Sequence, residues 1–305
     1  MPRGISKPFH LAATCLLASL IAGCSIFASP PAPTADPSKP APSARATSPQ
    51  GTSQPRPVSP FASLSSYLAS RAGQITAAVY DRRTRHTWVF HRGVRQDTAS
   101  IVKVEIMGTA LWEAEHGRPL SAAERALMIP MIEHSDNNAA TELLADVGGP
   151  RAVQRFDRRA GLYDTTPSRL RYIPGTTLPG WGLTKTTAFD EVRLVSRFAY
   201  PNSMLTTANR RYGLNLMENV ESDQAWGVSG GSYGVLSGAT VALKNGWLPH
   251  QLATNSDWQI NSIGWISGHG RDYVLAVLTD HNPSMPYGID TIDMIARSIY
   301  AELGA

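Results

Sequence analysis

Two groups of strand-like segments, separated by a block of helices, constrain the fold of this chain most strongly. Residues 74–81 and 86–92 have the composition of strands on either side of the polar turn "RRTR", which predicts a hairpin. Three further strand-like segments begin only at residue 238. Strands that are split by a helical insertion are expected to form one sheet assembled from both ends of the chain. We therefore predict an α+β fold, with an antiparallel sheet flanked by terminal helices and an all-helical subdomain beside it.

The helical block carries its own start and stop signals. The segment "SAAERALMI" opens with a capping box formed by Ser121 and Glu124, and Pro150 stands in the first turn of "PRAVQRFDRRAG". Pro130 is expected to break or kink the helix that begins after Ser121. Residues 162–185 show neither helical nor strand periodicity, and a patternless loop of that length in a compact domain is usually functional or disordered.

The first 60 residues differ in composition from the rest. Arg3 and Lys7 form a positive start before "LAATCLLASLIAG", an apolar stretch too short to cross a bilayer as a mature helix. We interpret residues 1–23 as a signal peptide and residues 24–60, which are mostly Pro, Ala, Ser and Thr, as a tether. The folded domain is expected at residues 61–305, enough for one large domain.

The segment "IAGC", which ends at Cys24, resembles the cleavage site of bacterial lipoproteins. That resemblance implies cleavage before Cys24, a lipid anchor on it, and a place outside the cytoplasm, on the outer face of the cell membrane. A plain secretory signal that is cut elsewhere is the alternative. The other cysteine, Cys15, lies within the signal, so the mature domain would have no disulfide and no thiolate site. The net charge of +4, with scattered arginines, does not indicate nucleic-acid binding.

Ser100 and Lys103 form a candidate pair of nucleophile and base. Residues three apart share one face of a helix, and a serine in the first turn lies near the positive end of the helix dipole and near free backbone donors. A serine hydroxyl needs a base to take its proton, and a desolvated lysine can be neutral and serve as that base. The same spacing also fits a capping serine beside a solvated lysine.

Two further motifs bear on this choice. "SDN" at residues 135–137 falls between two predicted helices, and "KNG" at residues 244–246 lies in a predicted strand. Ser-x-x-Lys, Ser-Asp-Asn and Lys-(Thr/Ser)-Gly, in this order, are the signature of class A β-lactamases and penicillin-binding proteins. Over residues 61–305 the chain resembles that superfamily. The resemblance implies a β-lactamase/transpeptidase-like fold and a serine hydrolase that works through an acyl-enzyme, without a cofactor or metal.

The resemblance also implies the catalytic roles. Ser100 would be the acylated nucleophile, Lys103 its proton partner, and Ser135 the relay that protonates the leaving nitrogen. The backbone amides of Ser100 and Trp247 would form the oxyanion hole. Asp136 is expected to brace the start of a helix.

The substrate-binding roles come from the same motifs. Asn137 would hold the amide side chain of the substrate, and Lys244 would attract its carboxylate. The amide of Asn245 stands where a hydroxyl is usual, next to Gly246 of the same motif. The implied substrate is a β-lactam or a D-alanyl stem peptide of peptidoglycan. The expected partners are this substrate and the membrane, with no nucleic acid, and the expected state is a monomer.

Two departures from class A enzymes affect the predicted activity. The span between Ser100 and Ser135 is shorter than in class A enzymes, which predicts wider access to the cleft. Class A enzymes also keep a Glu-x-x-Leu-Asn element whose glutamate activates the deacylating water, whereas here the loop before "TKTTAFD" has no glutamate. Its only acid, Asp164, is expected to be a turn residue. We therefore predict slow deacylation, with Asp164 and Glu191 as the first residues to test for a base.

Two other functions remain open. A catalytically idle domain could sense or sequester the same ligands. "GVSGG" at residues 227–231 matches the nucleophile elbow of α/β-hydrolases around Ser229, but that motif needs a strand before it and a helix after it. The eight histidines include no His-Glu-x-x-His pattern and no close pair on a helix face, so no zinc site is visible in the sequence.

Overall fold

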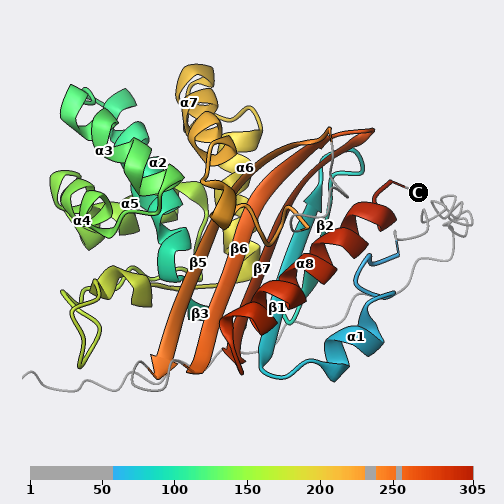
Figure 1. Cartoon of the computed structure of the whole chain (residues 1–305). Coiled ribbons are helices and arrows are strands. Elements are labelled where there is room, and N and C mark those ends of the chain that lie inside the picture. The colour runs from blue at the N-terminus through green and yellow to red at the C-terminus, as the bar shows by residue number, and fades with distance from the viewer. Residues whose placement is uncertain (1–57, 231–237, 252–255, 305) are drawn as a thin grey trace, which may run out of the picture. The chain divides into compact units, whose positions relative to one another are not determined.

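The computed structural model describes residues 58–230, 238–251 and 256–304, all of which lie within the unit formed by residues 55–305 (Figure 1). The predicted signal peptide and Cys24 lie outside the described residues, as does nearly all of the predicted tether. The division of the chain into these parts therefore stays a prediction. Within the described ranges, no helix combines the length and the apolar character needed to cross a membrane.

A five-stranded antiparallel sheet joins the two ends of the chain, in the order β2-β1-β7-β6-β5. Its strands are β1 (Gln74–Asp81), β2 (His86–Phe90), β5 (Thr240–Gln251), β6 (Ser256–Gly268) and β7 (Arg271–Asn282). The predicted hairpin is confirmed, since Ala77 pairs with Phe90 and Asp81 with His86. The contact between β1 and β7 confirms that strands from both ends of the chain build one sheet.

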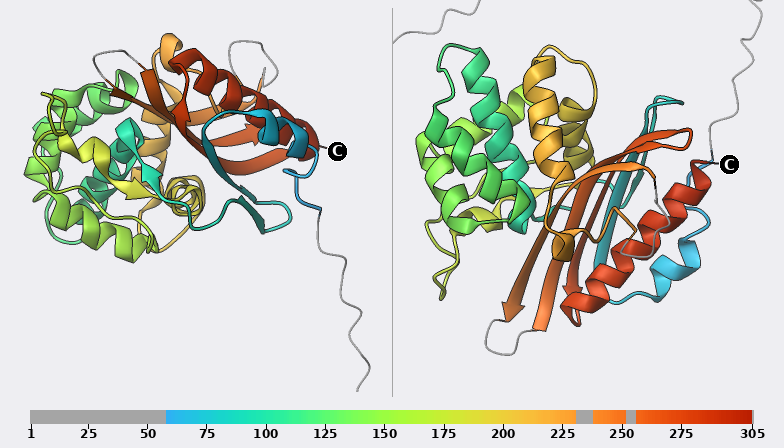
Figure 2. Two further views of the ribbon diagram at one scale, coloured as in Figure 1. Left: turned by 90° about the horizontal axis from the view of Figure 1, so that it is seen from below. Right: turned by 45° about the horizontal axis from the view of Figure 1, so that its top comes forward.

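Two terminal helices lie against one face of this sheet. They are α1 (Ser65–Ser70) and α8 (Met285–Glu302), which Figure 2 shows side by side. Helix α8 follows the last strand, and its apolar residues Ile292, Ile295 and Ile299 are fully buried with those of β6 and β7. Burial of one apolar stripe of a helix against one face of a sheet is the usual basis of a layered fold.

The remaining helices lie on the other side of the sheet (Figure 2). The helical block consists of α2 (Val102–Glu115), α3 (Ala122–Glu133), α4 (Asn137–Asp146), α5 (Pro150–Ala160), α6 (Ala188–Ala199) and α7 (Thr207–Glu218), of which α6 and α7 contact the sheet directly. Helix α2 is central to this block, because every residue from Val102 to Leu111 is buried. The α+β prediction with a separate helical subdomain is therefore confirmed.

Helix α3 shows which local signals were decisive. Its predicted capping box is present, since Ser121 and Glu124 exchange hydrogen bonds. Of the predicted break or kink at Pro130, the break is wrong, because the helix includes Pro130 and ends three residues later at Glu133, while the kink stays a prediction. Proline cannot donate the backbone hydrogen bond that would join it to the preceding turn. The carbonyl of Pro130 itself accepts hydrogen bonds from the backbone of His134 and Asp136, which closes the helix just before the second motif.

Short elements surround the serine motif. They are the strands β3 (Gln96–Asp97) and β4 (Lys185–Thr186), which pair with each other, and the 3₁₀ helices η1 (Ala99–Ile101), η2 (Gly180–Leu183) and η3 (Ser222–Gln224). The patternless loop 162–185 is tied back by bridges between Thr166 and Lys185 and between Tyr172 and Pro179. The pairing of β4 with β3, and the hydrogen bond from the backbone of Thr98 to that of Thr184 at 2.8 Å, place the end of the loop next to the start of α2.

Candidate active site

Ser100 lies in η1, directly before the central helix α2, and Lys103 lies one turn further on. The nitrogen Nζ of Lys103 is 3.0 Å from Oγ of Ser100, and the Lys103 residue has no exposed surface. Lys103 is therefore not the solvated lysine of the alternative interpretation. Ala99, just before the serine, has a φ of 47°, a left-handed conformation that is costly for a residue other than glycine and that occurs often at functional sites.

The other contacts of Lys103 define how its amine can act. Nζ donates to the backbone oxygen of Ser135 at 2.6 Å and to Oδ1 of Asn137 at 2.9 Å. Both of these oxygens only accept hydrogen bonds, so they can use two N–H groups of a neutral amine. The lone pair of that amine is then available to the hydroxyl of Ser100, from which it can accept a proton.

Electrostatics favour the neutral form of Lys103. Burial, together with the nearby positive charge of Lys244, lowers the pKa of Lys103 to about 6, and Asp136 opposes this shift only in part. Removal of an amine from water disfavours its charged form, which is the physical cause of the main shift. At neutral pH the amine is therefore a free base, as the proton acceptor of a serine nucleophile must be.

Ser135 connects the two lysines of the site. Its hydroxyl oxygen lies 3.0 Å from Nζ of Lys103 and 3.0 Å from Nζ of Lys244, so one hydroxyl is in hydrogen-bond contact with both amines. Burial lowers the pKa of Lys244 to about 7. Asp136 caps α4 by accepting a hydrogen bond from the backbone of Ala139 at 2.7 Å, and the expectation that it braces a helix is confirmed. The second motif thus places a hydroxyl and an amide at the start of a capped helix.

Gly246 of the third motif lies directly against the serine segment. A methyl group at Gly246 would come within 2.7 Å of the backbone nitrogen of Ser100 and within 2.7 Å of the backbone oxygen of Thr98. Only glycine lets β5, the edge strand of the sheet, approach η1 so closely. The role of Gly246 in this structure is therefore to permit close approach of the two backbones.

Asn245 does not point into the cleft, which corrects the prediction that its amide contacts the substrate. The residue is only 1% exposed, and Nδ2 donates to the backbone oxygens of Gln224 at 2.6 Å and Trp226 at 3.0 Å. Both amide hydrogens are thus used on the opposite side of β5, because successive side chains of a strand point to opposite faces. Asn245 holds the segment 224–226 against the sheet and offers no free donor to a carboxylate.

A small hollow of about 50 Å³ opens next to Ser100. Ten residues from the serine segment, α4, the 162–185 loop and β5 line it: Ala99, Ser100, Asn137, Ile173, Leu178, Pro179, Trp181, Gly182, Trp247 and Leu248. Half of these come from the loop, so the expectation that this loop is functional is supported by its position. The wider access predicted from the short span between Ser100 and Ser135 stays a prediction, since the lining of this hollow does not test it.

Trp181, a residue of the 162–185 loop, lies next to the amine of Lys103. The centre of its ring lies 4.9 Å from Nζ of Lys103, and Nε1 donates to Oγ1 of Thr141 at 3.1 Å. The hydrogen bond to α4 fixes the ring, and the ring keeps water from the amine. Trp247 also lines the hollow, and its ring packs against that of Trp226, with 6.1 Å between ring centres. The contribution of the Trp247 backbone N–H to the oxyanion hole stays a prediction.

No carboxylate belongs to the lining of the hollow at Ser100 among the described residues. Asp164 is exposed in a turn, as expected, and its backbone nitrogen donates to Asp190. Glu191 is 1% exposed within the helical block, where its carboxyl contacts that of Glu105. Neither of the two candidate bases therefore lies in the hollow.

Asn261 is a functional contributor that the sequence reasoning missed. Its Nδ2 donates to the backbone oxygens of Asp97 at 2.8 Å and Thr98 at 2.9 Å, which holds the segment leading to Ser100 against β6. Gln259 donates in turn to Oδ1 of Asn261 at 2.9 Å. The signal for this arrangement was the run of polar residues in "WQINSIGW", since fully buried polar side chains in a strand need partners.

Ser229 does not form a nucleophile elbow. It follows η3 rather than a strand, and its hydroxyl donates to the backbone oxygen of Ala225 at 2.7 Å. The next described element is the strand β5, whereas an elbow would be followed by a helix. The interpretation of Ser229 as an esterase nucleophile is therefore wrong.

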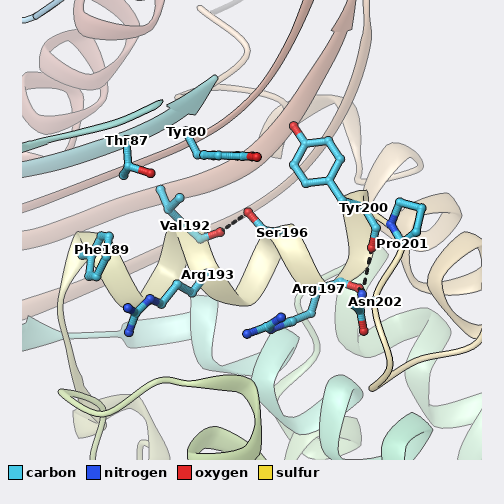
Figure 3. A pocket seen from close by; sticks show the side chains of 10 residues that line it. All are labelled: Tyr80, Thr87, Phe189, Val192, Arg193, Ser196, Arg197, Tyr200, Pro201 and Asn202. Atoms are coloured by element: carbon cyan, nitrogen blue, oxygen red, sulfur yellow. Dashed lines mark hydrogen bonds between the residues drawn. The ribbon is translucent and has the colours of Figure 1, made fainter. Parts of the chain in front are cut away.

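A second hollow, of about 290 Å³, lies between α6 and the β1–β2 hairpin and contains two arginines (Figure 3). Arg193 donates to the backbone oxygen of Gly161 at 2.7 Å, and Arg197 donates to that of Ala160 at 3.1 and 2.7 Å. The guanidinium groups thus cap the carboxyl end of α5, where positive charge is favourable. We find no pair of nucleophile and base in its lining, which contrasts with the hollow at Ser100.

Comparisons with known proteins agree with this geometry. A family model described as "Beta-lactamase enzyme family" matches residues 120–303. Among solved structures, a class A beta-lactamase representative from Bacteroides cellulosilyticus shares 17% identity at a TM-score of 0.68, covering 80% of this chain and 97% of that one. The extended-spectrum beta-lactamase TLA-1 shares 18% identity at a TM-score of 0.69, covering 81% and 98%. A class A beta-lactamase from Mycobacterium abscessus shares 22% at a TM-score of 0.65, covering 81% and 100%.

Proposed function

Because this chain belongs to the beta-lactamase enzyme family, and is a serine hydrolase of that superfamily, we propose that it acts through an acyl-enzyme on Ser100. The observation that carries the proposal is the hydrogen-bond network in which Lys103 Nζ lies 3.0 Å from both Ser100 Oγ and Ser135 Oγ. A nucleophile and a second hydroxyl that both contact a desolvated base are the groups that acyl transfer to serine requires.

In the proposed acylation, Oγ of Ser100 attacks the carbonyl carbon of the substrate while its proton passes to the neutral amine of Lys103. The backbone N–H groups of Ser100 and Trp247 would stabilise the negative oxygen. The bond between carbon and the leaving nitrogen then breaks. The hydroxyl of Ser135 gives its proton to that nitrogen and takes one from Lys103, so that the protons balance and an ester remains on Ser100.

The proposed substrates are β-lactams or D-alanyl peptides of the cell wall. Oδ1 of Asn137 accepts from Lys103, which leaves the amide nitrogen of Asn137 free to donate to a substrate carbonyl. Lys244 provides positive charge on the far side of Ser135, where a substrate carboxylate would lie. The similar solved structures are those of beta-lactamases, which supports this substrate class.

The proposal is tested by incubating the chain with a fluorescent penicillin and locating the label by mass spectrometry. We expect one label, on the peptide that contains Ser100, and no label in a Ser100→Ala variant. Ser229→Ala is a matched control that should be labelled like the wild type. Labelling at another residue, or none at all, would contradict the proposed acyl-enzyme with β-lactams.

A catalytically idle binding module for the same ligands is the second candidate. The hollow at Ser100, about 50 Å³, is smaller than the roughly 300–1,000 Å³ of a typical ligand pocket, which bears on binding and on acylation alike. Saturable binding of penicillin without any covalent adduct on Ser100 would identify an idle module.

We further propose that the protein is exported as a lipoprotein anchored through Cys24 to the outer face of the cell membrane, as a monomer. The support is the sequence "IAGC" followed by a segment rich in proline. Metabolic labelling with a fatty acid and membrane fractionation test this, with Cys15→Ala as the matched control for Cys24→Ala. We expect Cys24→Ala alone to lose the lipid. An unmodified amino terminus on wild-type protein in the medium would refute the anchor.

A further inference from the structure

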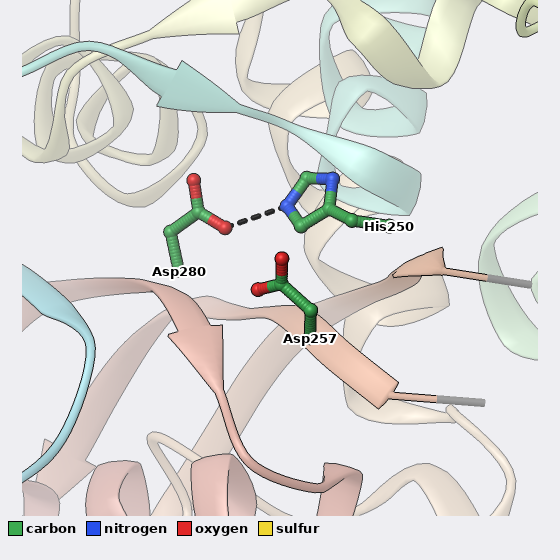
Figure 4. A group of neighbouring side chains, drawn as sticks. All are labelled: His250, Asp257 and Asp280. Atoms are coloured by element: carbon green, nitrogen blue, oxygen red, sulfur yellow. Dashed lines mark hydrogen bonds and ion pairs between the residues drawn. The ribbon is translucent and has the colours of Figure 1, made fainter. Parts of the chain in front are cut away.

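Four side chains with metal-binding atoms gather at one end of the sheet. His250 lies near the end of β5, three residues beyond Trp247, and Asp257 lies at the start of β6. Asp280 and His281 lie near the end of β7. Figure 4 shows that the side chains of His250, Asp257 and Asp280 point toward one another from these strands. The sequence pattern gave no sign of this group, because its members come from three strands.

The distances within this group are close to those of a metal site. One ligand atom each from His250, Asp257 and Asp280 can be chosen so that all lie within 4.8 Å of one another. Ligand atoms around a tetrahedral zinc ion, at about 2.0–2.2 Å from it, lie about 3.4 Å apart. Nε2 of His250 is already 2.6 Å from Oδ1 of Asp280. Small rotations of side chains therefore suffice, while the backbones stay in the sheet.

The ion-pair partners of the two carboxylates are themselves able to bind a metal. Among the described residues, the carboxylates of Asp257 and Asp280 form ion pairs only with His250 and His281, and with no lysine or arginine. A metal ion at this place would replace the proton that Nε2 of His250 shares with Asp280. The side chains of His250, Asp257 and Asp280 are 26%, 28% and 16% exposed, so an ion can enter from solvent.

The type of ligand indicates which ion fits. Imidazole nitrogen combined with carboxylate oxygen suits zinc and similar transition metals, whereas calcium and magnesium prefer oxygen alone. Nδ1 of His281 donates to Oδ1 of Asp257 at 2.8 Å, and a residue that orients a metal ligand makes such a hydrogen bond to it. The backbones of Asp257 and His281 are both left-handed, with φ of 60° and 56°, a conformation that non-glycine residues adopt rarely.

We propose that His250, Asp257 and Asp280 bind one divalent transition-metal ion of the zinc type, that solvent completes its coordination, and that His281 orients Asp257. The site is separate from the serine chemistry, since none of these residues lines the hollow at Ser100. Its ligands stand on three paired strands of the sheet, which fixes their spacing in advance of binding.

The test uses the full chain without an affinity tag, freed of metal with a chelator. Equilibrium dialysis against Zn²⁺, with the metal counted by mass spectrometry, should give one ion per chain. His250→Gln and Asp280→Asn should each weaken binding at least about tenfold, in line with the loss of a metal-site partner. Zinc should raise the melting temperature of the wild type and not that of the variants. Mg²⁺ at the same concentration should not bind.

His116→Gln is the matched control, because His116 is exposed and its ring contacts only the backbone oxygen of Trp112, at 2.7 Å, and the ring of Trp112. It should bind zinc like the wild type. The proposal fails if the wild type holds no zinc, or if His250→Gln binds zinc as tightly as the wild type does. Circular dichroism establishes that each variant is folded, and if Asp280→Asn is not, His250→Gln alone decides the result.

Discussion

Lys103 is held with its amine nitrogen 3.0 Å from the hydroxyl oxygen of Ser100, in a place from which water is excluded. The contact alone would fit a simple hydrogen bond. Two further partners of this amine only accept hydrogen bonds, and the pKa of Lys103 is lowered. The amine is therefore suited to act as a neutral base rather than as a positively charged group.

The first prediction follows from this role. Lys103→Ala should slow acylation of Ser100 by about 10² to 10⁴, the usual value of a positioned general base. The measurement is the rate at which the penicillin adduct appears by intact-mass spectrometry. Lys185→Ala is the control, since Lys185 is half exposed and pairs with Asp97, and its rate should stay near that of the wild type. A loss of only about threefold in Lys103→Ala would place the base elsewhere.

The second prediction concerns pH. Because burial lowers the pKa of Lys103 to about 6, acylation should rise as the pH increases through about 6 and the amine loses its proton. Burial lowers the pKa of Lys244 to about 7, so its positive charge is lost above that pH. Acylation by a substrate with a carboxylate should therefore fall again above pH 7, whereas a neutral ester should show only the rise near 6. Rate profiles with both substrates test this, and a flat profile from pH 5 to 8 would contradict it.

The third prediction separates Asn245 from Lys244. Asn245→Ala leaves the buried carbonyls of Gln224 and Trp226 without their donor, which should lower the free energy of unfolding by about 1–3 kcal/mol. The substrate concentration at which this variant is acylated at half its maximal rate should stay within about threefold of the wild-type value. Lys244→Ala should show the opposite pattern, with weak acylation by carboxylated substrates. Urea unfolding and acylation kinetics on both variants decide, and a selective loss of carboxylated substrates in Asn245→Ala would restore its predicted binding role.

Local sequence was sufficient for much of the fold. Helical spacing alone placed Ser100 and Lys103 on one face, and the capping box of Ser121 and the β1–β2 hairpin were read from neighbouring residues. The separation of the two groups of strands by helices predicted one sheet that is built from both ends of the chain. The association of Ser135 and Lys244 with this pair came from the motif resemblance, since more than thirty residues separate each from Lys103, and no local rule joins them.

Contacts between distant segments decided the rest. The direction of the Asn245 side chain depends on two carbonyls about twenty residues earlier, and that of Asn261 depends on carbonyls of Asp97 and Thr98. The cluster of His250, Asp257 and Asp280 requires the register of three strands. Pro130 stayed within its helix because burial of its neighbours Met128, Met131 and Ile132 outweighs the hydrogen bond that proline cannot make.

The fourth prediction concerns buried acids in the helical block. Glu105 on α2, Asp157 on α5 and Glu191 on α6 are at most 1% exposed. Burial, with the neighbouring carboxyls second, raises the pKa of Asp157 to about 8, and burial also raises that of Glu191 to about 8. The folded state therefore holds protons that the unfolded chain releases near pH 4. The stability from these protons is complete below that pH and is lost as the pH rises through about 8.

Asp157→Asn should accordingly stabilise the protein more at pH 8 than at pH 5, because the stability that the bound protons provide falls progressively between about pH 4 and pH 8. We expect a gain on the order of 1 kcal/mol or more at pH 8, which is roughly 2–4 °C in melting temperature for a domain of this size. Calorimetry at both pH values measures the difference. Glu142→Gln, at an exposed position of α4, is the control and should show no such dependence on pH. A variant that is destabilised equally at pH 5 and pH 8 would show that the carboxyl of Asp157 is needed in its charged form.

The last prediction concerns the fate of the acyl-enzyme. Acylation and deacylation are separate steps, and the hydroxyl and amine groups at Ser100 provide for the first, while no carboxylate lines the described hollow to activate water for the second. The apolar side chains of Ile173, Leu178 and Trp181 stand there instead. Without a general base, deacylation should run about 10² to 10⁴ slower than in an enzyme that has one, which is roughly 3 to 5 kcal/mol in barrier. Penicillin should give a burst of about one equivalent and an adduct on Ser100 that persists for minutes or longer.

Two variants make this test sharper. Asp164→Asn and Glu191→Gln should leave the lifetime of the adduct within about threefold of the wild type, because Asp164 is exposed in a turn and Glu191 contacts Glu105 inside the helical block. Intact-mass spectrometry over time measures all three proteins. Rapid turnover without a burst in the wild type would show that water reaches the ester with a base in place. A much longer lifetime in one of the two variants would then identify that base, since removal of any other carboxyl leaves the deacylating water unchanged.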